Sequence, residues 1–179
     1  MINWNIVICV YQDGFKRAVR ALQRLGRVER SPYHNVLVMS AEDPMATLEA
    51  IERQAEQIPA LYDAISRVSP FTQTFEFQSA EEFRDKARER VIDWLPRLAG
   101  RSFHVRFHRR GLRGDLRSPE VERFLDDVLL DALKQAGTPG TISFSDPGAV
   151  IAIETIDNRA GLALWSREEL ARHRLVRPD

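Results

Sequence analysis

The 179-residue chain has one cysteine, no net charge and no apolar run long enough to cross a membrane. A membrane-spanning helix needs about 20 consecutive apolar residues. The first residues also lack the basic start and apolar core of a secretory signal peptide. Because Cys9 stands alone, no internal disulfide can form, which is typical of a reducing compartment. We therefore expect a cytoplasmic protein that is not associated with a membrane.

Lysine is also scarce. Of the 26 basic residues only Lys16, Lys86 and Lys134 are lysines, and the other 23 are arginines, against 26 acidic residues. The arginine guanidinium binds phosphate bidentately and stacks on bases better than the lysine ammonium does. A GC-rich genome gives the same bias, so the positions of the arginines indicate more than their number.

Motifs for chemistry are missing as well. The sequence has neither the G-x-x-x-x-G-K-[ST] phosphate loop nor the G-x-G-x-x-G dinucleotide fingerprint. One cysteine and four scattered histidines exclude the usual zinc frameworks. Asp126, Asp127 and Asp131 lie on a predicted helix, where Asp127 and Asp131 share one face as a Mg²⁺ or paired-carboxylate site would need, but a solvated helix face explains them without further cost. We expect no catalytic residue, no metal and no cofactor, and predict that the chain is not an enzyme.

What the sequence does contain is a basic segment at residues 101–117, with six arginines, two histidines and one acidic residue. Phe103, Val105 and Phe107 alternate with polar residues, which predicts a strand with one buried face. Its candidate ligand-binding residues are Arg101, His104, Arg106, His108, Arg109, Arg110, Arg113 and Arg117. Concentrated positive charge on a protein without net charge predicts a polyanionic ligand, and RNA above all.

The two histidines of this segment do not suit metal binding or proton transfer. On a strand, His104 and His108 are separated by about 13 Å, at about 3.3 Å per residue, which is too far for one ion. Each has arginine neighbours, whose charge lowers the pKa of an imidazole. Stacking on a base or contacting a phosphate is the functional hypothesis for both. A solvent-facing histidine without a role is the alternative.

The first 77 residues predict a β-α-β-β-α-β order, the ferredoxin-like arrangement. The helices begin after Asp13 and at Asp43-Pro44, a strong N-cap and first-turn pair. The expected elements are strand 4–11, helix 14–25, strands 27–30 and 33–39, helix 44–58 and an extended segment 65–77.

The helix 14–25 carries a second set of basic residues. Lys16, Arg20, Arg24 and Arg27 recur at helical spacing and form one stripe. A solvated helix face is the simplest interpretation of this stripe. If it continues an RNA-binding surface, Lys16 and Arg20 are the residues we expect to contact RNA.

Residues 78–179 predict a second domain. A capping box at Ser79 and Glu82 opens a helix over 80–95, and Ser118-Pro119 opens another over 119–135. The basic strand lies between them, and the remaining elements are extended segments at 141–144, 149–156 and 160–165 and a short helix after Ser166. The predicted fold class is α+β, with an N-terminal ferredoxin-like domain (1–77) packed on a C-terminal α/β domain (78–179).

This second domain resembles THUMP domains, the RNA-binding modules of tRNA-modifying enzymes. The resemblance rests on the strand 103–110, the helix start 118–123 and the turn and strand 145–155. It implies a THUMP-like fold behind a ferredoxin-like domain, and tRNA, typically its acceptor region, as ligand. Arg106, His108, Arg109, Arg110 and Arg113 match the family's RNA-facing strand and loop.

The closing segment 160–175 is similar to the C-terminus of stand-alone THUMP proteins. Those proteins assist a separate acetyltransferase that makes N4-acetylcytidine in tRNA. The resemblance therefore implies a tRNA-binding accessory protein with an acetyltransferase or a similar enzyme as partner, because no methyltransferase, sulfur-transfer or deaminase domain follows in this chain.

Two other functions remain open from the residues alone. One is a small stand-alone hydrolase of phosphate-containing substrates on a ferredoxin-like scaffold, with arginines holding the anion. The other is a protein-interaction module whose arginine surface docks an acidic partner.

Overall fold

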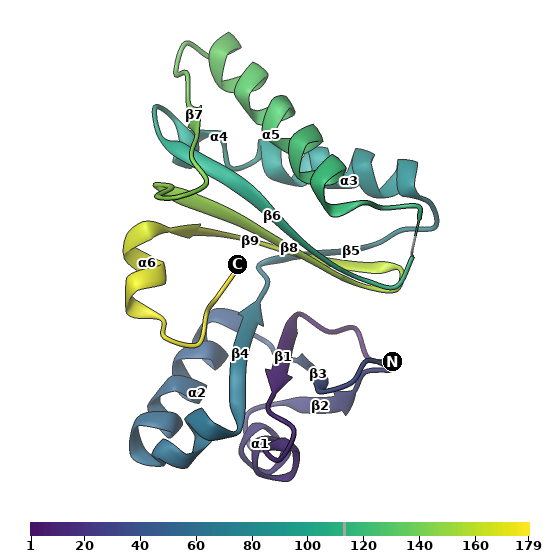
Figure 1. The fold of residues 1–179 in the computed structure, drawn as a ribbon, viewed down its shortest axis with the longest axis vertical. Coiled ribbons are helices and arrows are strands. Elements are labelled where there is room, and N and C mark those ends of the chain that lie inside the picture. Colours follow the sequence, from purple (N-terminus) through teal and green to yellow (C-terminus); the bar gives the residue numbers. More distant parts are fainter. Residues whose placement is uncertain (113) are drawn as a thin grey trace. The chain divides into compact units, whose positions relative to one another are not determined.

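The computed structural model describes residues 1–112 and 114–179. The chain divides into two compact units, Met1–Thr72 with Leu170–Arg177, and Gln73–Glu169 with Pro178–Asp179. Each unit has a sheet and helices, so the predicted α+β class is confirmed (Figure 1). No described helix is long and apolar enough to span a membrane.

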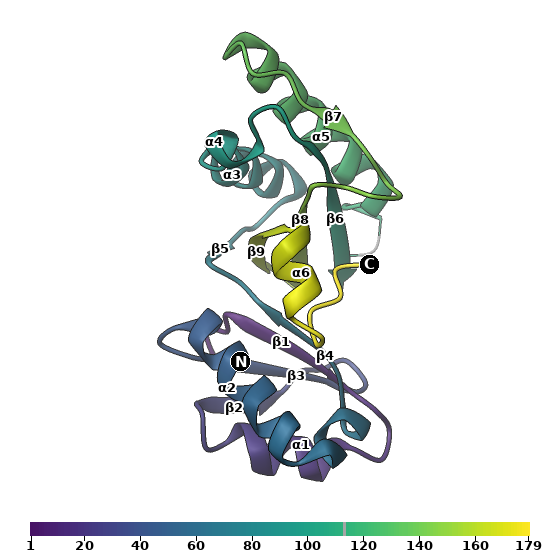
Figure 2. The same ribbon diagram turned by 90° about the vertical axis from the view of Figure 1, so that its left-hand side faces the viewer.

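The first unit has the β-α-β-β-α-β order expected from the sequence. Its sheet has the strand order β2-β3-β1-β4, with every neighbouring pair antiparallel. Helices α1 and α2 lie against one face of this sheet (Figures 1 and 2). The elements are β1 (Ile6–Val10), α1 (Phe15–Leu22), β2 (Arg27–Arg30), β3 (Val36–Ser40), α2 (Pro44–Gln57), the 3₁₀ helix η1 (Pro59–Asp63) and β4 (Ile65–Pro70).

Helix α2 begins where the sequence predicts. The Asp43 carboxylate accepts hydrogen bonds from the backbone N–H groups of Met45 (3.1 Å) and Ala46 (3.0 Å), and Pro44 occupies the first turn. Leu48, Ile51 and Ala55 are its buried residues, at the i, i+3 and i+7 spacing of one helix face.

The second unit has a five-stranded mixed sheet in the order β5-β9-β8-β6-β7. Strand β6 is parallel to β7 and β8, and the other neighbouring pairs are antiparallel. The elements are β5 (Gln73–Glu76), α3 (Ala80–Ile92), α4 (Leu95–Leu98), β6 (Ser102–Arg110), α5 (Ser118–Gln135), β7 (Thr141–Ile142), β8 (Ala149–Ile156) and β9 (Arg159–Ser166), followed by α6 (Arg167–Arg172).

The alternation of the basic strand is correctly predicted. Helices α3 and α5 cover one face of the second sheet (Figure 1), and Phe103, Val105 and Phe107 are buried in the core there. The ring of Phe107 lies 5.3 Å from that of Phe83 in α3. Burial of these aromatic and branched side chains stabilises the unit, at about 1.5–3 kcal/mol per side chain.

The division of the chain differs from the predicted boundary at residue 77. The extended segment 65–77 forms two strands in different sheets, because β4 pairs with β1 whereas β5 pairs with β9. The C-terminal residues 170–177 belong to the first unit, where Val68 N–H donates to the Leu175 carbonyl at 2.9 Å. Periodicity shows that a segment is extended, but it does not show which sheet the segment joins.

Candidate nucleic-acid interface

The polar face of β6 was the predicted RNA-binding surface, but His104 is not at the surface. Its side chain is 1% exposed, and its ring lies 5.6 Å from that of Phe144. Burial lowers the pKa of His104, and the charge of Arg106 lowers it further. The expectation of a solvent-facing imidazole is therefore wrong for this residue, and a base or phosphate cannot reach it in this structure.

The next residues along the same face contact the C-terminal end of the chain. His108 Nε2 lies 2.8 Å from the carbonyl oxygen of Pro178. Arg106 Nε lies 3.7 Å from the Asp179 carboxylate. This face thus holds Pro178 and Asp179 against the sheet of their own unit.

The two arginines at the end of β6 are half-buried, although the sequence predicted both to be exposed. The Arg110 guanidinium donates to the Glu154 carboxylate at 2.7 Å, and these side chains are only 16% and 3% exposed. Arg109 donates to the Gly111 carbonyl at 2.6 Å. A buried guanidinium beside a carboxylate offers little net charge to a phosphate. Arg113 lies outside the described residues.

The far edge of β6 is covered by acidic residues of α5. Strand β7 pairs only with Ser102 and Phe103, so the N–H groups of Val105 and Phe107 find no strand partner on that side. They donate instead to the carboxylates of Asp126 and Glu122, both at 2.9 Å. An unpaired edge N–H is costly when buried, and these carboxylates satisfy it.

Asp126 differs from the solvated helix residue that the sequence indicated. It is 6% exposed, and burial raises its pKa to about 7, with the charges of Glu122 and Asp127 adding to the effect. Asp127 and Asp131 are exposed, as expected. Among the described residues, no group of three His, Cys, Asp or Glu side chains could hold a metal ion.

Exposed positive charge is concentrated instead on α1 and just after it. Lys16, Arg17, Arg20 and Arg24 are all exposed, and α1 contains no acidic residue. In the part of the chain that the structure describes, none of the four forms an ion pair. Their charge is available to a ligand in solution.

Two basic residues of the predicted segment are also exposed. Arg101 lies just before β6. Arg117 is the residue just before α5. Its side chain is 70% exposed and lies 3.6 Å from the Glu120 carboxylate. An exposed pair of this kind is weak, so Arg117 exchanges its partner easily.

The charge balance of the two units also indicates that the available positive charge lies on the first unit. The first unit has 11 Lys and Arg residues against eight Asp and Glu, whereas the second has 15 against 18. The positive excess therefore lies in the first unit, and the basic strand belongs to the acidic one. The arginine cluster of residues 101–117 conceals this balance in the sequence, because the acidic residues dispersed along α3 and α5 outnumber it.

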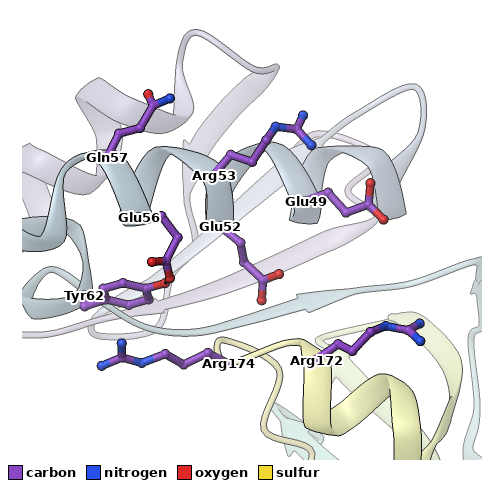
Figure 3. A pocket seen from close by; sticks show the side chains of 8 residues that line it. All are labelled: Glu49, Glu52, Arg53, Glu56, Gln57, Tyr62, Arg172 and Arg174. Atoms are coloured by element: carbon purple, nitrogen blue, oxygen red, sulfur yellow. Dashed lines mark hydrogen bonds between the residues drawn. The ribbon is translucent and has the colours of Figure 1, made fainter.

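A charged hollow of about 490 Å³ lies between α2 and the C-terminal segment of the first unit (Figure 3). Three of the charged residues that line it, Glu52, Glu56 and Arg174, already have partners. Tyr62 donates its hydroxyl to the Glu56 carboxylate, which raises the pKa of Tyr62, and the Arg174 guanidinium lies 3.9 Å above the Tyr62 ring. Glu52 binds His173 at 2.8 Å. These contacts fasten residues 172–175 to α2.

Solved structures share the fold of this chain. PH1313 from Pyrococcus horikoshii matches 90% of it with a TM-score of 0.61 at 13% identity, over 54% of its own chain. TrmN from Thermus thermophilus matches 89% with a TM-score of 0.55 at 20% identity, over 44% of its own chain. A 4-thiouridine synthetase, solved in complex with RNA and ATP, matches 90% with a TM-score of 0.56 at 15% identity, over 41% of its own chain.

At these identities the likeness is one of fold. It agrees with the resemblance to THUMP proteins, whose enzymes include sulfur-transfer and methyltransferase members. No protein-family model and no curated protein sequence matches the chain. The chain spans about half, or less, of the length of the three structures.

The comparisons contradict the expectation of a non-enzyme. Besides the 4-thiouridine synthetase, chains with this fold include a predicted N6-adenine-specific DNA methylase from Listeria monocytogenes and a possible methylase from Clostridium difficile. The fold therefore occurs in proteins named as enzymes, and the lack of a catalytic motif in these residues does not define the protein's class.

Proposed function

We propose that this chain is an RNA-binding module that binds tRNA and presents it to the active site of a tRNA-modifying enzyme. The observation that carries the proposal is the basic surface of α1, where four exposed cations have no acidic partner in the described structure. The fold shared with a synthetase solved in complex with RNA supports it.

The proposed phosphate contacts are Lys16, Arg20 and Arg24 of the first unit and Arg101 and Arg117 of the second. All five side chains are exposed. The supporting role of holding β6 and the C-terminus in place belongs to Arg106, His108, Arg109 and Arg110. The modification that the sequence resemblance favours is formation of N4-acetylcytidine by a partner acetyltransferase, with this chain as its tRNA-binding accessory.

Filter binding of total tRNA at several salt concentrations tests this proposal. These five phosphate contacts predict a log–log slope of affinity against salt of roughly −3.5 to −4.5. Absence of binding at low salt would refute the proposed function.

Paired substitutions locate the contacts. Lys16→Glu combined with Arg20→Glu should weaken tRNA binding by about tenfold or more, because two phosphate contacts become repulsions, each worth about 1 kcal/mol. The matched control is Arg123→Glu combined with Lys134→Glu, two exposed positions on α5 with the same change of charge. Equal losses in the two variants would show that net charge, and not the α1 surface, governs binding.

A further inference from the structure

A small hollow lies between α1 and the end of α2 in the first unit. It has a volume of about 170 Å³ and is lined by Arg17, Arg20, Ala21, Arg24, Gln54, Ile58 and Leu61. The lining brings together the arginines of one helix and the apolar residues where α2 passes into η1. It is separate from the charged hollow of Figure 3, which lies along the side of α2 that faces the C-terminal segment.

The floor of this hollow is aliphatic. Ala21 and Leu61 contribute side chains that are partly or fully buried, while Ile58 is 53% exposed. Among the described residues, the other exposed large apolar side chains are those of Met1, Tyr11 and Phe144. An exposed isoleucine beside a buried leucine loses unfavourable contact with water when an apolar group covers both.

The rim of the hollow has charge of one sign. Arg17, Arg20 and Arg24 recur at helical spacing along one side, and no carboxylate lines the hollow. The Arg17 guanidinium donates to the Ala60 carbonyl at 3.2 Å, which orders it beside the floor. An aliphatic floor within a cationic rim is complementary to a ligand that is apolar at one point and acidic around it.

We propose that this hollow docks an acidic, leucine-bearing segment of a partner protein. One aliphatic side chain of the segment covers Ile58 and Leu61, and flanking carboxylates pair with the arginines. The lining has no aromatic ring on which a nucleobase could stack.

This docking site goes beyond the proposed binding of tRNA, although Arg20 and Arg24 take part in both. The two ligands differ in what they need from the protein. Phosphates need only positive charge, whereas the segment needs the charges of the rim and the aliphatic floor. A substitution that changes only the floor therefore separates them.

Fluorescence anisotropy with two short labelled peptides tests the proposal. One alternates glutamate and leucine, and the other alternates glutamate and serine with the same charge. The leucine peptide should bind about tenfold or more tightly than the serine peptide, as burial of one leucine side chain predicts. Ile58→Ser should bring the two affinities together and leave tRNA binding unchanged.

Ala21→Gln provides a second variant that fills the hollow without changing charge. It should have the same effect as Ile58→Ser, with circular dichroism confirming that both variants fold. Equal binding of the two peptides to the unchanged protein, or an Ile58→Ser variant that still prefers leucine, would overturn the docking site. Weaker tRNA binding by Ile58→Ser would assign the hollow to a nucleobase and also overturn it. If the unchanged protein does not bind tRNA but still prefers the leucine peptide, only the proposed function is refuted.

Discussion

At the scale of single residues, the structure separates arginines that hold the fold from arginines that are available to a ligand. Arg110 and Arg20 look alike in the sequence, since both lie in clusters of basic residues. Arg110 is paired with a carboxylate that is 3% exposed, whereas Arg20 is exposed on a helix without acidic residues. What distinguishes them is a partner 44 positions away along the chain, Glu154, which no local pattern reveals.

Substitution of Arg110 should therefore affect stability before it affects binding. Arg110→Glu leaves the buried Glu154 carboxylate facing a second negative charge, and we expect the free energy of unfolding to fall by about 3 kcal/mol or more. Urea denaturation measures the change. Arg117→Glu is the control, because at an exposed position we expect a loss of only about 0.5 kcal/mol. Equal losses in the two variants would show that the Arg110–Glu154 pair does not stabilise the fold.

At the scale of elements, the helices and strands of the second unit follow closely from the sequence. The strand predicted from the alternation of Phe103, Val105 and Phe107 is β6 (Ser102–Arg110), and the predicted helix 119–135 is α5 (Ser118–Gln135). The periodicity does not show how α5 contacts the edge of β6. Asp126 and Glu122 of α5 accept hydrogen bonds from the edge of β6, so these carboxylates replace a neighbouring strand.

This edge contact predicts a dependence of stability on pH. Burial raises the pKa of Asp126 to about 7 in the folded protein, while in the unfolded chain it is about 3.9. The protonated carboxyl therefore favours folding, and its contribution is complete below about pH 4 and is lost as pH rises through about 7.

Asp126→Asn keeps a side-chain oxygen that can accept the hydrogen bond from Val105 N–H, and the amide side chain does not ionise. The stability of this variant relative to that of the unchanged protein should increase from pH 5 to pH 8, as measured by denaturant unfolding at both values. Asp127→Asn, at the exposed neighbouring position, should show no such trend. Parallel pH profiles for the unchanged protein and Asp126→Asn would contradict the raised pKa.

At the scale of the whole molecule, two features decide what each unit does. The C-terminal residues 170–177 belong to the first unit, and the positive excess belongs to that unit as well. Glu52 of α2 is central to the first feature, because its carboxylate binds His173 Nδ1 at 2.8 Å and accepts from Leu175 N–H at 3.4 Å.

Glu52→Ala should release this C-terminal segment. Loss of both contacts should cost about 1–3 kcal/mol and leave the backbone N–H of Leu175 without its side-chain acceptor. Limited trypsin digestion should then cleave faster after Arg172 and Arg174, as followed by mass spectrometry. Glu49→Ala, at an exposed position one turn earlier on α2, should leave the cleavage rate unchanged. Equal cleavage of the two variants would show that Glu52 does not hold the segment.

Local patterns in the sequence were enough to predict the α+β class, the β-α-β-β-α-β order of the first unit and the buried face of β6. They were enough because capping, helical spacing and alternation act within a few residues of the chain. Only the tertiary structure decided which charges are available to a ligand, since Arg106, His108 and Arg110 meet partners 44 or more positions away. Packing within the second unit partly buries the basic strand, whereas in the first unit the arginines of α1 stay exposed beside an aliphatic hollow.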